Sequence, residues 1–344
     1  MSSSYIIIST FVNKLSLYQY LQMKLFIKLY SVIAITLILS SCTDLEITPL
    51  TSWKQLSNFP GAARASATSF VYGDKAYICL GRSGSKYDFL KDVWEYDSKT
   101  DTWVQKSDFP GAARVKAIGA VIGNKAYVGL GAIAPYAGNQ FGDFWEYDIA
   151  NDSWKRLADF PGPGKNDLTC VVIDNCIYVT LGFDDTGFVK QTYKYDPPTN
   201  TWTQLKDCPI VRTAVAGFAI GPDFYVGTGY QSGNHKDFYK YDTQQNAWTR
   251  IADAPEAKVL AKGLSMNGKG YVLLGRHWDG TIDGGKLLSS IDRYNAETTT
   301  WTRCGDFPGG GRQNMVVFTI NGKGYIVGGE DDAERKSDVW MFEP

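Results

Sequence analysis

The stretch FPGAAR occupies residues 59–64 and returns unchanged at residues 109–114, and FPGPGK at 160–165 and FPGGGR at 307–312 are close copies. Six basic residues end this stretch or its looser variants: Arg64, Arg114, Lys165, Arg212, Lys258 and Arg312. A tyrosine follows each of them thirteen residues later: Tyr77, Tyr127, Tyr178, Tyr225, Tyr271 and Tyr325. A spacing that is kept six times without an insertion indicates a rigid, repeated structural unit.

Each unit has the pattern of four β-strands. An apolar run, a short turn such as Gly-Asp or Asn-Gly, and a second run such as AYICLG at 76–81 predict a tight hairpin. A third motif, VWEYD at 93–97 in the first unit, recurs every 46 to 53 residues. In five units a tryptophan stands seven residues beyond its tyrosine: Trp103, Trp154, Trp202, Trp248 and Trp301. Four strands with a period near 50 residues predict the blade of a β-propeller.

The closing glycine of the hairpin, the Tyr-Asp pair and the tryptophan resemble kelch repeats over essentially all of residues 50–344. Kelch strands usually carry a Gly-Gly pair, and here only Gly328-Gly329 keeps it. The other five units have Leu80, Leu130, Leu181, Thr228 and Leu274 in the first place. We interpret this change as drift at a packing position, and the fold class is all-β, a six-bladed propeller of kelch repeats.

The two ends of the repeat region predict how the ring closes. The last unit stops at Pro344 after its third strand, and Trp53 in SWKQL precedes the first unit. We therefore expect the amino-terminal strand to complete the carboxy-terminal blade, which leaves no open sheet edge. This gives one propeller domain over residues 53–344, expected to be a monomer.

The amino terminus has the features of a bacterial lipoprotein precursor. Residues 23–42, MKLFIKLYSVIAITLILSSC, combine two lysines, an apolar run and small residues before a cysteine, which is typical of a signal peptide. The end of this segment, Leu39-Ser40-Ser41-Cys42, resembles the lipobox, in which cleavage leaves a diacylated cysteine. We expect a signal peptide over 1–41 with the true start at Met23, lipidation of Cys42, and a tether over 43–52. The protein would then sit in the cell envelope, periplasmic or on the surface, with a lipid as its sole membrane contact.

Composition narrows the function classes. A net charge of −1 argues against nucleic-acid binding, which usually needs a basic excess. Five cysteines follow Cys42, and an odd number without paired spacing is poor evidence for disulfides, so Cys208 and Cys304 are expected to be small buried residues. With His235 and His277 as the two histidines, we predict no metal site and no cofactor.

Chain direction predicts which face of the propeller carries a binding site. In antiparallel blades two kinds of connection emerge on one face: those between the second and third strands (2–3), and those from the fourth strand to the first strand of the next blade (4–1). The 2–3 connections vary in length, and the longest lies in the fifth unit at 276–290. Variable loops on a uniform scaffold are usual binding sites. The six basic residues are expected around the channel mouth on this face. They either pair with carboxylates or carbonyls of a neighbouring blade, or recognise an anionic ligand.

Further candidate ligand-binding residues follow the hairpin glycine. Six unlike residues occupy this position: Arg82, Ala132, Phe183, Tyr230, Arg276 and Glu330. Aromatic planes with cations and a carboxylate suit a sugar or peptide, although a freely varying loop start would give the same mixture. Other loop residues are Tyr136, His235, Trp278, Asp184, Asp185, Asp279 and Asp331. We select Trp278 as the stacking residue, and assign the repeated Tyr and Trp residues, with Asp101 and Asp152, to packing and turns.

Two functions follow from the resemblance. Kelch propellers commonly act as interaction platforms, which favours a non-enzymatic binding module for an anionic glycan or a partner protein. Six-bladed kelch proteins also include sialic acid mutarotases, and that likeness implies that Arg64, Arg114 and Arg312 hold the sugar carboxylate while Glu330 assists proton transfer. A copper oxidase of the galactose oxidase type needs a Tyr and His ligand set, and the two histidines lie in no pattern that would build one.

Overall fold

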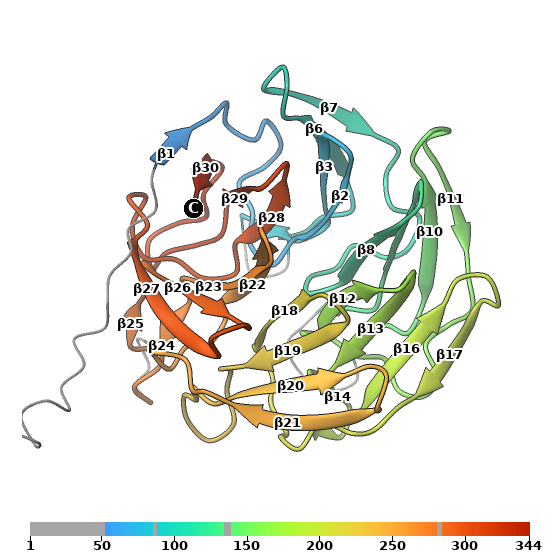
Figure 1. Ribbon diagram of the computed structural model, residues 1–344. Helices are drawn as coiled ribbons and strands as arrows, with labels where there is room; N and C mark the ends of the chain where they lie inside the picture. Colours follow the sequence, from blue (N-terminus) through green and yellow to red (C-terminus); the bar gives the residue numbers. More distant parts are fainter. Residues whose placement is uncertain (1–51, 85–87, 134–138, 281–283) are drawn as a thin grey trace, which may run out of the picture. The chain divides into compact units, whose positions relative to one another are not determined.

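The computed structural model describes residues 52–84, 88–133, 139–280 and 284–344. They belong to one compact unit, Ile47–Pro344. Every regular element among them is a β-strand, and six four-stranded antiparallel sheets surround a central axis as the blades of a propeller (Figure 1). The prediction of an all-β, six-bladed propeller is confirmed. No helix in these ranges is long and apolar enough to span a membrane.

In each blade the strands are ordered from the channel outward. The strands of blade 1 are β2 (Thr68–Tyr72), β3 (Lys75–Cys79), β6 (Val93–Asp97) and β7 (Thr102–Lys106). Those of blade 2 are β8 (Ile118–Ile122), β9 (Lys125–Gly129), β10 (Phe144–Asp148) and β11 (Ser153–Arg156). Those of blade 3 are β12 (Thr169–Ile173), β13 (Cys176–Thr180), β16 (Thr192–Asp196) and β17 (Thr201–Gln204).

The second half of the ring repeats this order. The strands of blade 4 are β18 (Ala216–Ile220), β19 (Asp223–Gly227), β20 (Phe238–Asp242) and β21 (Ala247–Ile251). Those of blade 5 are β22 (Lys262–Met266), β23 (Lys269–Leu273), β26 (Ser290–Asn295) and β27 (Thr300–Asp306). Those of blade 6 are β28 (Val316–Ile320), β29 (Lys323–Val327), β30 (Val339–Glu343) and β1 (Ser52–Gln55).

Three of the 2–3 loops contain a small hairpin of their own. The pairs are β4 (Arg82–Ser83) with β5 (Asp88–Phe89), β14 (Phe183–Asp184) with β15 (Gly187–Phe188), and β24 (Arg276–His277) with β25 (Lys286–Leu287). They belong to blades 1, 3 and 5 and extend the loop face in alternate blades.

The ring closes through the amino-terminal strand, as predicted. Strand β1 pairs antiparallel with β30, and Trp53 stands opposite Phe342. The innermost strands of the last and first blades, β28 and β2, also contact each other. Figure 1 shows β1 at the outer edge of the blade that contains β28, β29 and β30.

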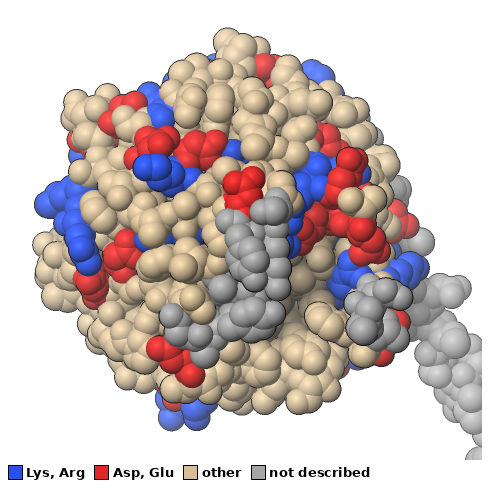
Figure 2. All heavy atoms as spheres, turned by 180° about the vertical axis from the view of Figure 1, so that it is seen from behind, with Lys and Arg blue, Asp and Glu red and all other residues tan. Residues whose placement is uncertain are grey.

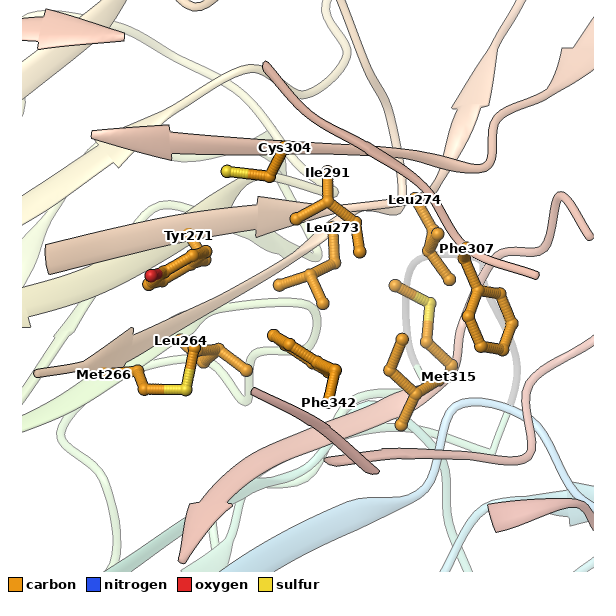
Figure 3. Close-up of a cluster of buried hydrophobic side chains, with 11 residues drawn as sticks. Leu264, Met266, Tyr271, Leu273, Leu274, Ile291, Cys304, Phe307, Met315 and Phe342 are labelled. Carbon is orange, nitrogen blue, oxygen red and sulfur yellow. The ribbon is translucent and has the colours of Figure 1, made fainter. Parts of the chain in front are cut away.

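The hydrophobic core lies between the blades. Each of six clusters of buried side chains joins two neighbouring sheets. Figure 3 shows the cluster between blades 5 and 6, where Leu273 and Ile291 of blade 5 face Met315 and Phe342 of blade 6. Because every blade buries both faces against its neighbours, its stability depends on the whole ring.

The repeated Tyr, Asp and Trp residues link successive blades, which confirms their structural role. In blade 1, Tyr96 donates a 2.9 Å hydrogen bond to Asp101, and the Ser57 backbone N–H donates to the same carboxylate. The Trp103 indole donates to the Ser57 carbonyl at 3.4 Å. Ser57 follows β1 of blade 6, so one turn of blade 1 holds the outer strand of the preceding blade.

Candidate functional site

The variable loops gather on one face of the propeller. Strand direction places the 2–3 and 4–1 connections there, and Figure 2 shows this face. Basic and acidic side chains lie next to one another on it, without a large field of one sign (Figure 2). A ligand would therefore meet local charged groups rather than a uniform potential.

The six predicted cations are buried inside the blades. Their exposed fractions lie between 0% and 5%. Arg64 shows the common arrangement: its guanidinium donates to both oxygens of Asp92, at 2.7 and 2.6 Å, and to the Leu80 carbonyl at 3.1 Å. Three more pairs repeat this geometry: Arg114–Asp143, Arg212–Asp237 and Arg312–Asp338.

The two lysines of the set use other carboxylates. Lys165 pairs with Asp184 at 2.6 Å, and Lys258 pairs with Asp292 at 2.7 Å. In the four arginine blades the residue before the third strand is aspartate, whereas the lysine blades have Gln191 and Ser290 at the equivalent positions. This internal covariation is visible in the sequence and indicates which carboxylate each arginine binds.

These ion pairs favour the first of the two roles that we considered for the six basic residues, pairing with protein carboxylates. The expected location of the partners was wrong. Each basic residue pairs within its own blade, and not with a neighbouring blade as we expected. Burial raises the pKa of Asp143, but the hydrogen bonds from Arg114 and Trp145 and the Arg114 charge outweigh it and leave that pKa below its ordinary value. The pair thus remains ionised and acts as a clamp. It joins the FPGAAR stretch at 109–114 to the end of the loop between the second and third strands. Ligand binding by the six cations stays a prediction.

A different ring of residues borders the channel mouth. It consists of Ser66, Lys116, Asp167, Ala214, Leu260 and Asn314, each two positions beyond a basic residue. All six adopt left-handed backbone conformations with φ between 55° and 57°. Backbone N–H groups donate from one blade to the next, as from Lys116 to the Ser66 carbonyl at 3.0 Å. Our expectation that the six basic residues stand at the mouth was therefore wrong.

Two ring residues carry charge at the mouth. Lys116 and Asp167 pair at 2.7 Å, and the Thr213 hydroxyl donates to Asp167 at 3.1 Å. Burial raises the pKa of Asp167, but the charges of Lys116 and Lys262 and the two hydrogen bonds lower it by more. The pKa of Asp167 therefore lies below its ordinary value. An ionised aspartate between blades 2 and 4 is thus fixed at the mouth.

A second polar cluster joins blades 1 and 6. Arg82 donates to both oxygens of Glu330, at 2.8 and 2.9 Å, and the Asn314 amide donates to Glu330 at 2.9 Å. Arg335 lies 3.5 Å from the same carboxylate. The structure thus brings two predicted residues together, Arg82 and Glu330. Donors surround the Glu330 carboxylate, which favours an anchoring role over proton transfer.

An aromatic row crosses blades 3, 4 and 5 on this face. Phe183 contacts Phe188 with ring centroids 5.7 Å apart, Phe188 lies 6.2 Å from Tyr230, and Tyr230 lies 5.7 Å from Trp278. Trp278 is 41% exposed, and the other three rings are half-buried. Three of the four were predicted. Phe188 was missed, although its place in a loop rather than in a repeated strand was a usable signal.

The remaining predicted residues are scattered. Arg276 is buried, donates to the Gly284 carbonyl and pairs with Asp332. The His235 ring contacts the Gln231 carbonyl at 2.9 Å. Asp331 pairs with Lys336 at 2.7 Å. Ala132 is buried. Asp185 lies in the turn between β14 and β15, and Asp279 lies two residues beyond β24. Cys42 and Tyr136 lie outside the described residues.

Cysteines and metal ligands form no centre in the part of the chain that the structure describes. No group of three or more His, Cys, Asp or Glu side chains there could hold a metal ion. The five described cysteines are free, and burial raises the pKa of the Cys79 and Cys208 thiols to about 12. Cys208 and Cys304 are buried among apolar side chains, as predicted.

Comparison with known proteins agrees with this architecture. The family model described as Kelch motif matches residues 63–110 and 165–209. These two segments of the chain are kelch motifs. Kelch-like protein 35 of Mus musculus is 24% identical over 205 residues, which cover 59% of this chain and 33% of that protein. N-acetylneuraminate epimerase of Pasteurella multocida (strain Pm70) is 35% identical over 75 residues, 20% of each chain.

A solved structure has the same fold. The structure of YjhT aligns with a TM-score of 0.70 and 19% identity, covering 83% of this chain and 96% of that chain. An identity this low shows the fold alone. The matched part spans about a third of the length of Kelch-like protein 35 and a fifth of the epimerase.

The missing kelch Gly-Gly pairs have a backbone explanation. Leu80, Leu130 and Leu274 adopt φ of 64°, 59° and 55° in the first position of the pair. Leu181 and Thr228 do the same, with φ of 62° and 59°. Our interpretation as drift at a packing position was thus incomplete, because the position favours glycine for its left-handed conformation. In three of these five blades the clamping arginine binds the carbonyl of this residue and holds the turn: Leu80, Leu130 and Thr228.

Proposed function

We propose that this kelch propeller is a binding module that presents its loop face to a glycan or a partner protein. The aromatic row of Phe183, Phe188, Tyr230 and Trp278 carries the proposal. Its rings come from three blades and form a continuous strip on the face with the variable loops. Exposed aromatic rings supply large contact area and stack on sugar faces or on side chains.

The loop that bears Trp278 is held in place. The Trp278 backbone N–H donates to Asn234 at 2.9 Å, and the Asn234 amide donates to the Trp278 carbonyl. Asn234 belongs to blade 4 and Trp278 to blade 5, so the strip is braced across the blade boundary. A braced aromatic residue loses little conformational entropy on binding, which favours a recognition role.

We also propose that the propeller is tethered to a bacterial envelope through a lipid on Cys42. The lipobox-like Leu39-Ser40-Ser41-Cys42 supports this. Expression of the full-length sequence with Cys42→Ser in a bacterial host should move the protein from the detergent phase to the aqueous phase in phase partitioning. Unchanged partitioning would contradict lipidation at this residue.

The binding proposal is tested with the full-length protein on a glycan array and by capture of envelope proteins. Trp278→Ala and Tyr230→Ala should weaken binding at least several-fold, because each removes a stacking plane. Tyr72→Ala is the matched control, since Tyr72 is 40% exposed and ends β2 at the opposite face. Equal losses in all three variants would contradict a site at the aromatic row.

A second candidate function is mutarotation of an acidic sugar. The match to N-acetylneuraminate epimerase over 20% of this chain supports it. The test is exchange NMR of sialic acid with the wild-type protein and with Glu330→Gln. Faster exchange of the anomers that Glu330→Gln abolishes would support this activity. Exchange at the uncatalysed rate would exclude it for sialic acid.

A further inference from the structure

One charged side chain stands where the repeat calls for none. Lys262 begins β22, four positions beyond Lys258. The other five blades have apolar or hydroxyl side chains at this position: Thr68, Ile118, Thr169, Ala216 and Val316. Those five are buried between neighbouring blades. A lysine in such a position costs desolvation free energy unless an anion answers it.

Lys262 lines a cavity inside the central channel. The cavity has a volume of about 130 Å³, and its walls come from the inner strands and adjoining loops of blades 1, 2, 3, 5 and 6. A single water needs only about 10–15 Å³ by the same measure, so the cavity is large enough for one small oxyanion. Gly119 and Gly263 on its wall let neighbouring inner strands approach closely, because a Cβ atom there would lie 2.6 Å from the Ser69 carbonyl oxygen and 2.2 Å from the Gly217 carbonyl oxygen.

The charges around this cavity do not balance. Asp167 is the nearby carboxylate, and Lys116 already pairs with it at 2.7 Å. The Lys262 ammonium makes no hydrogen bond and no ion pair within 4.0 Å among the described residues. Burial lowers the pKa of Lys262, and the Lys116 charge adds to this effect while Asp167 opposes it. Lys116 and Lys262 thus share one nearby carboxylate, Asp167.

A second donor faces the same space. Ser69 of β2 lines the cavity, and its hydroxyl has no hydrogen-bond partner among the residues that the structure describes. An ammonium and a hydroxyl that line the same small cavity are suitable donors for the two oxygens of a carboxylate. Met315 and Val317 supply an apolar wall against which a short carbon chain would pack.

We propose that the central channel binds a small carboxylate, held by the ammonium of Lys262 and the hydroxyl of Ser69. The carboxylate comes either from a free small acid or from a larger ligand whose body stays at the channel mouth. This site is separate from the aromatic row and does not rest on the proposed function.

Acetate is the first probe, applied to the protein expressed from its full-length sequence. Saturation-transfer NMR should detect bound acetate methyl groups, and the melting temperature should rise with acetate concentration at constant ionic strength. Glucuronate, whose ring exceeds the cavity, distinguishes the two sources: competition with acetate would mean entry from the mouth. Sulfate tests selectivity for carboxylates.

Matched variants decide the role of Lys262. Lys262→Met, and Lys262→Thr, which copies blades 1 and 3, should weaken acetate binding about ten-fold or more. Ser69→Ala should weaken it several-fold, while Lys155→Met, on the exposed strand β11, and Trp278→Ala should leave it unchanged. Without acetate, Lys262→Met should melt at or above the wild-type temperature, because a half-buried ammonium without a hydrogen-bond partner is replaced by an apolar side chain.

Two outcomes would overturn the proposal. One is a wild-type protein that shows neither acetate signal nor thermal shift at tens of millimolar. The other is undiminished acetate binding by Lys262→Met. A lower melting temperature for Lys262→Met together with no acetate binding by wild type would assign a purely structural role to the ammonium. Ser69→Ala keeps the test valid if the lysine variants do not fold.

Discussion

Arg114 shows how one side chain can hold two loops together. It is 1% exposed, donates to Asp143 at 2.6 Å and to the Leu130 carbonyl at 3.0 Å, and lies over the Phe109 ring at 4.9 Å. The same contacts recur at Arg64 and Arg312. Positive charge that looked available for a ligand is used inside the blade, because a buried guanidinium needs partners for its N–H groups.

Arg114→Met should destabilise the protein by about 3–5 kcal/mol, since it leaves the Asp143 carboxylate half-buried without its partner. Urea unfolding followed by tryptophan fluorescence measures this change. Arg156→Met is the control, because its pair with Asp159 is exposed at 57% and 53% and should change stability by less than about 1 kcal/mol. Similar small losses for both variants would contradict the clamp.

The same clamps predict a loss of stability in acid. The pKa values of Asp92, Asp143 and Asp237 lie below their ordinary value of 3.8, because arginine hydrogen bonds outweigh the effect of burial. A carboxyl whose folded pKa is depressed contributes stability above the unfolded value, and this contribution is lost as the pH falls through the folded value. The free energy of unfolding should therefore drop from about pH 5 to about pH 2.

The control for this acid effect is a variant without one clamp. The stability difference between wild type and Asp143→Asn, measured by urea unfolding at each pH, should shrink in acid as the wild-type carboxyl becomes protonated. A difference that stays constant with pH would show that ionisation of Asp143 contributes nothing.

The turns between the third and fourth strands repeat one structure, and blade 5 departs from it at a single residue. Asp101, Asp152, Asn200 and Asn246 occupy the left-handed position of the turn, with φ from 49° to 55°, and each accepts the hydroxyl of the tyrosine five residues earlier. Blade 5 has Thr299 there, with φ of 54°. A β-branched residue is strained in this conformation, and threonine lacks the carbonyl oxygen that would accept the tyrosine.

Thr299→Asn should therefore stabilise the protein by about 0.5–2 kcal/mol, because it relieves the strain and supplies an acceptor for Tyr294. The reverse change in blade 4 is the matched control. Asn246→Thr removes the acceptor of Tyr241 and of the Lys206 N–H, at 2.6 and 2.8 Å, and should cost about 1–3 kcal/mol. Denaturant unfolding measures the free energy of unfolding of both variants. A change of the same sign in both would contradict the interpretation.

Closure of the ring is a property of the complete propeller. Strand β1 supplies the outer strand of blade 6, and the Trp53 ring lies 5.2 Å from Phe307 and 5.0 Å from Phe342. The first and last blades are thereby joined by hydrogen bonds and by aromatic packing. Without β1, the edge of β30 would be open to pairing with another chain.

Trp53→Ala should lower stability by as much as about 3–5 kcal/mol, and a chain that starts at Leu56 should aggregate. Light scattering after size exclusion compares that chain with one that starts at Ile47 and keeps β1. Val104→Ala, at a side chain 55% exposed on β7, should have almost no effect on unfolding. A monomeric, fully stable protein without β1 would contradict closure by this strand.

The sequence by itself determined the blade count, the strand order and the closure, because these depend on spacings that recur along the chain. A turn of fixed length and a tyrosine at a fixed distance specify a hairpin wherever they occur. The pairing of Arg114 with Asp143 was also encoded, since aspartate precedes the third strand only in the arginine blades.

Only the tertiary structure decided which of the candidate residues meet. Phe183, Tyr230 and Trp278 form one strip with Phe188, and Arg82 reaches Glu330 across the ring closure. Both the strip and this ion pair join residues from different blades. Their distances depend on how the sheets pack around the axis, and side-chain packing between distant segments leaves no periodic pattern in the sequence.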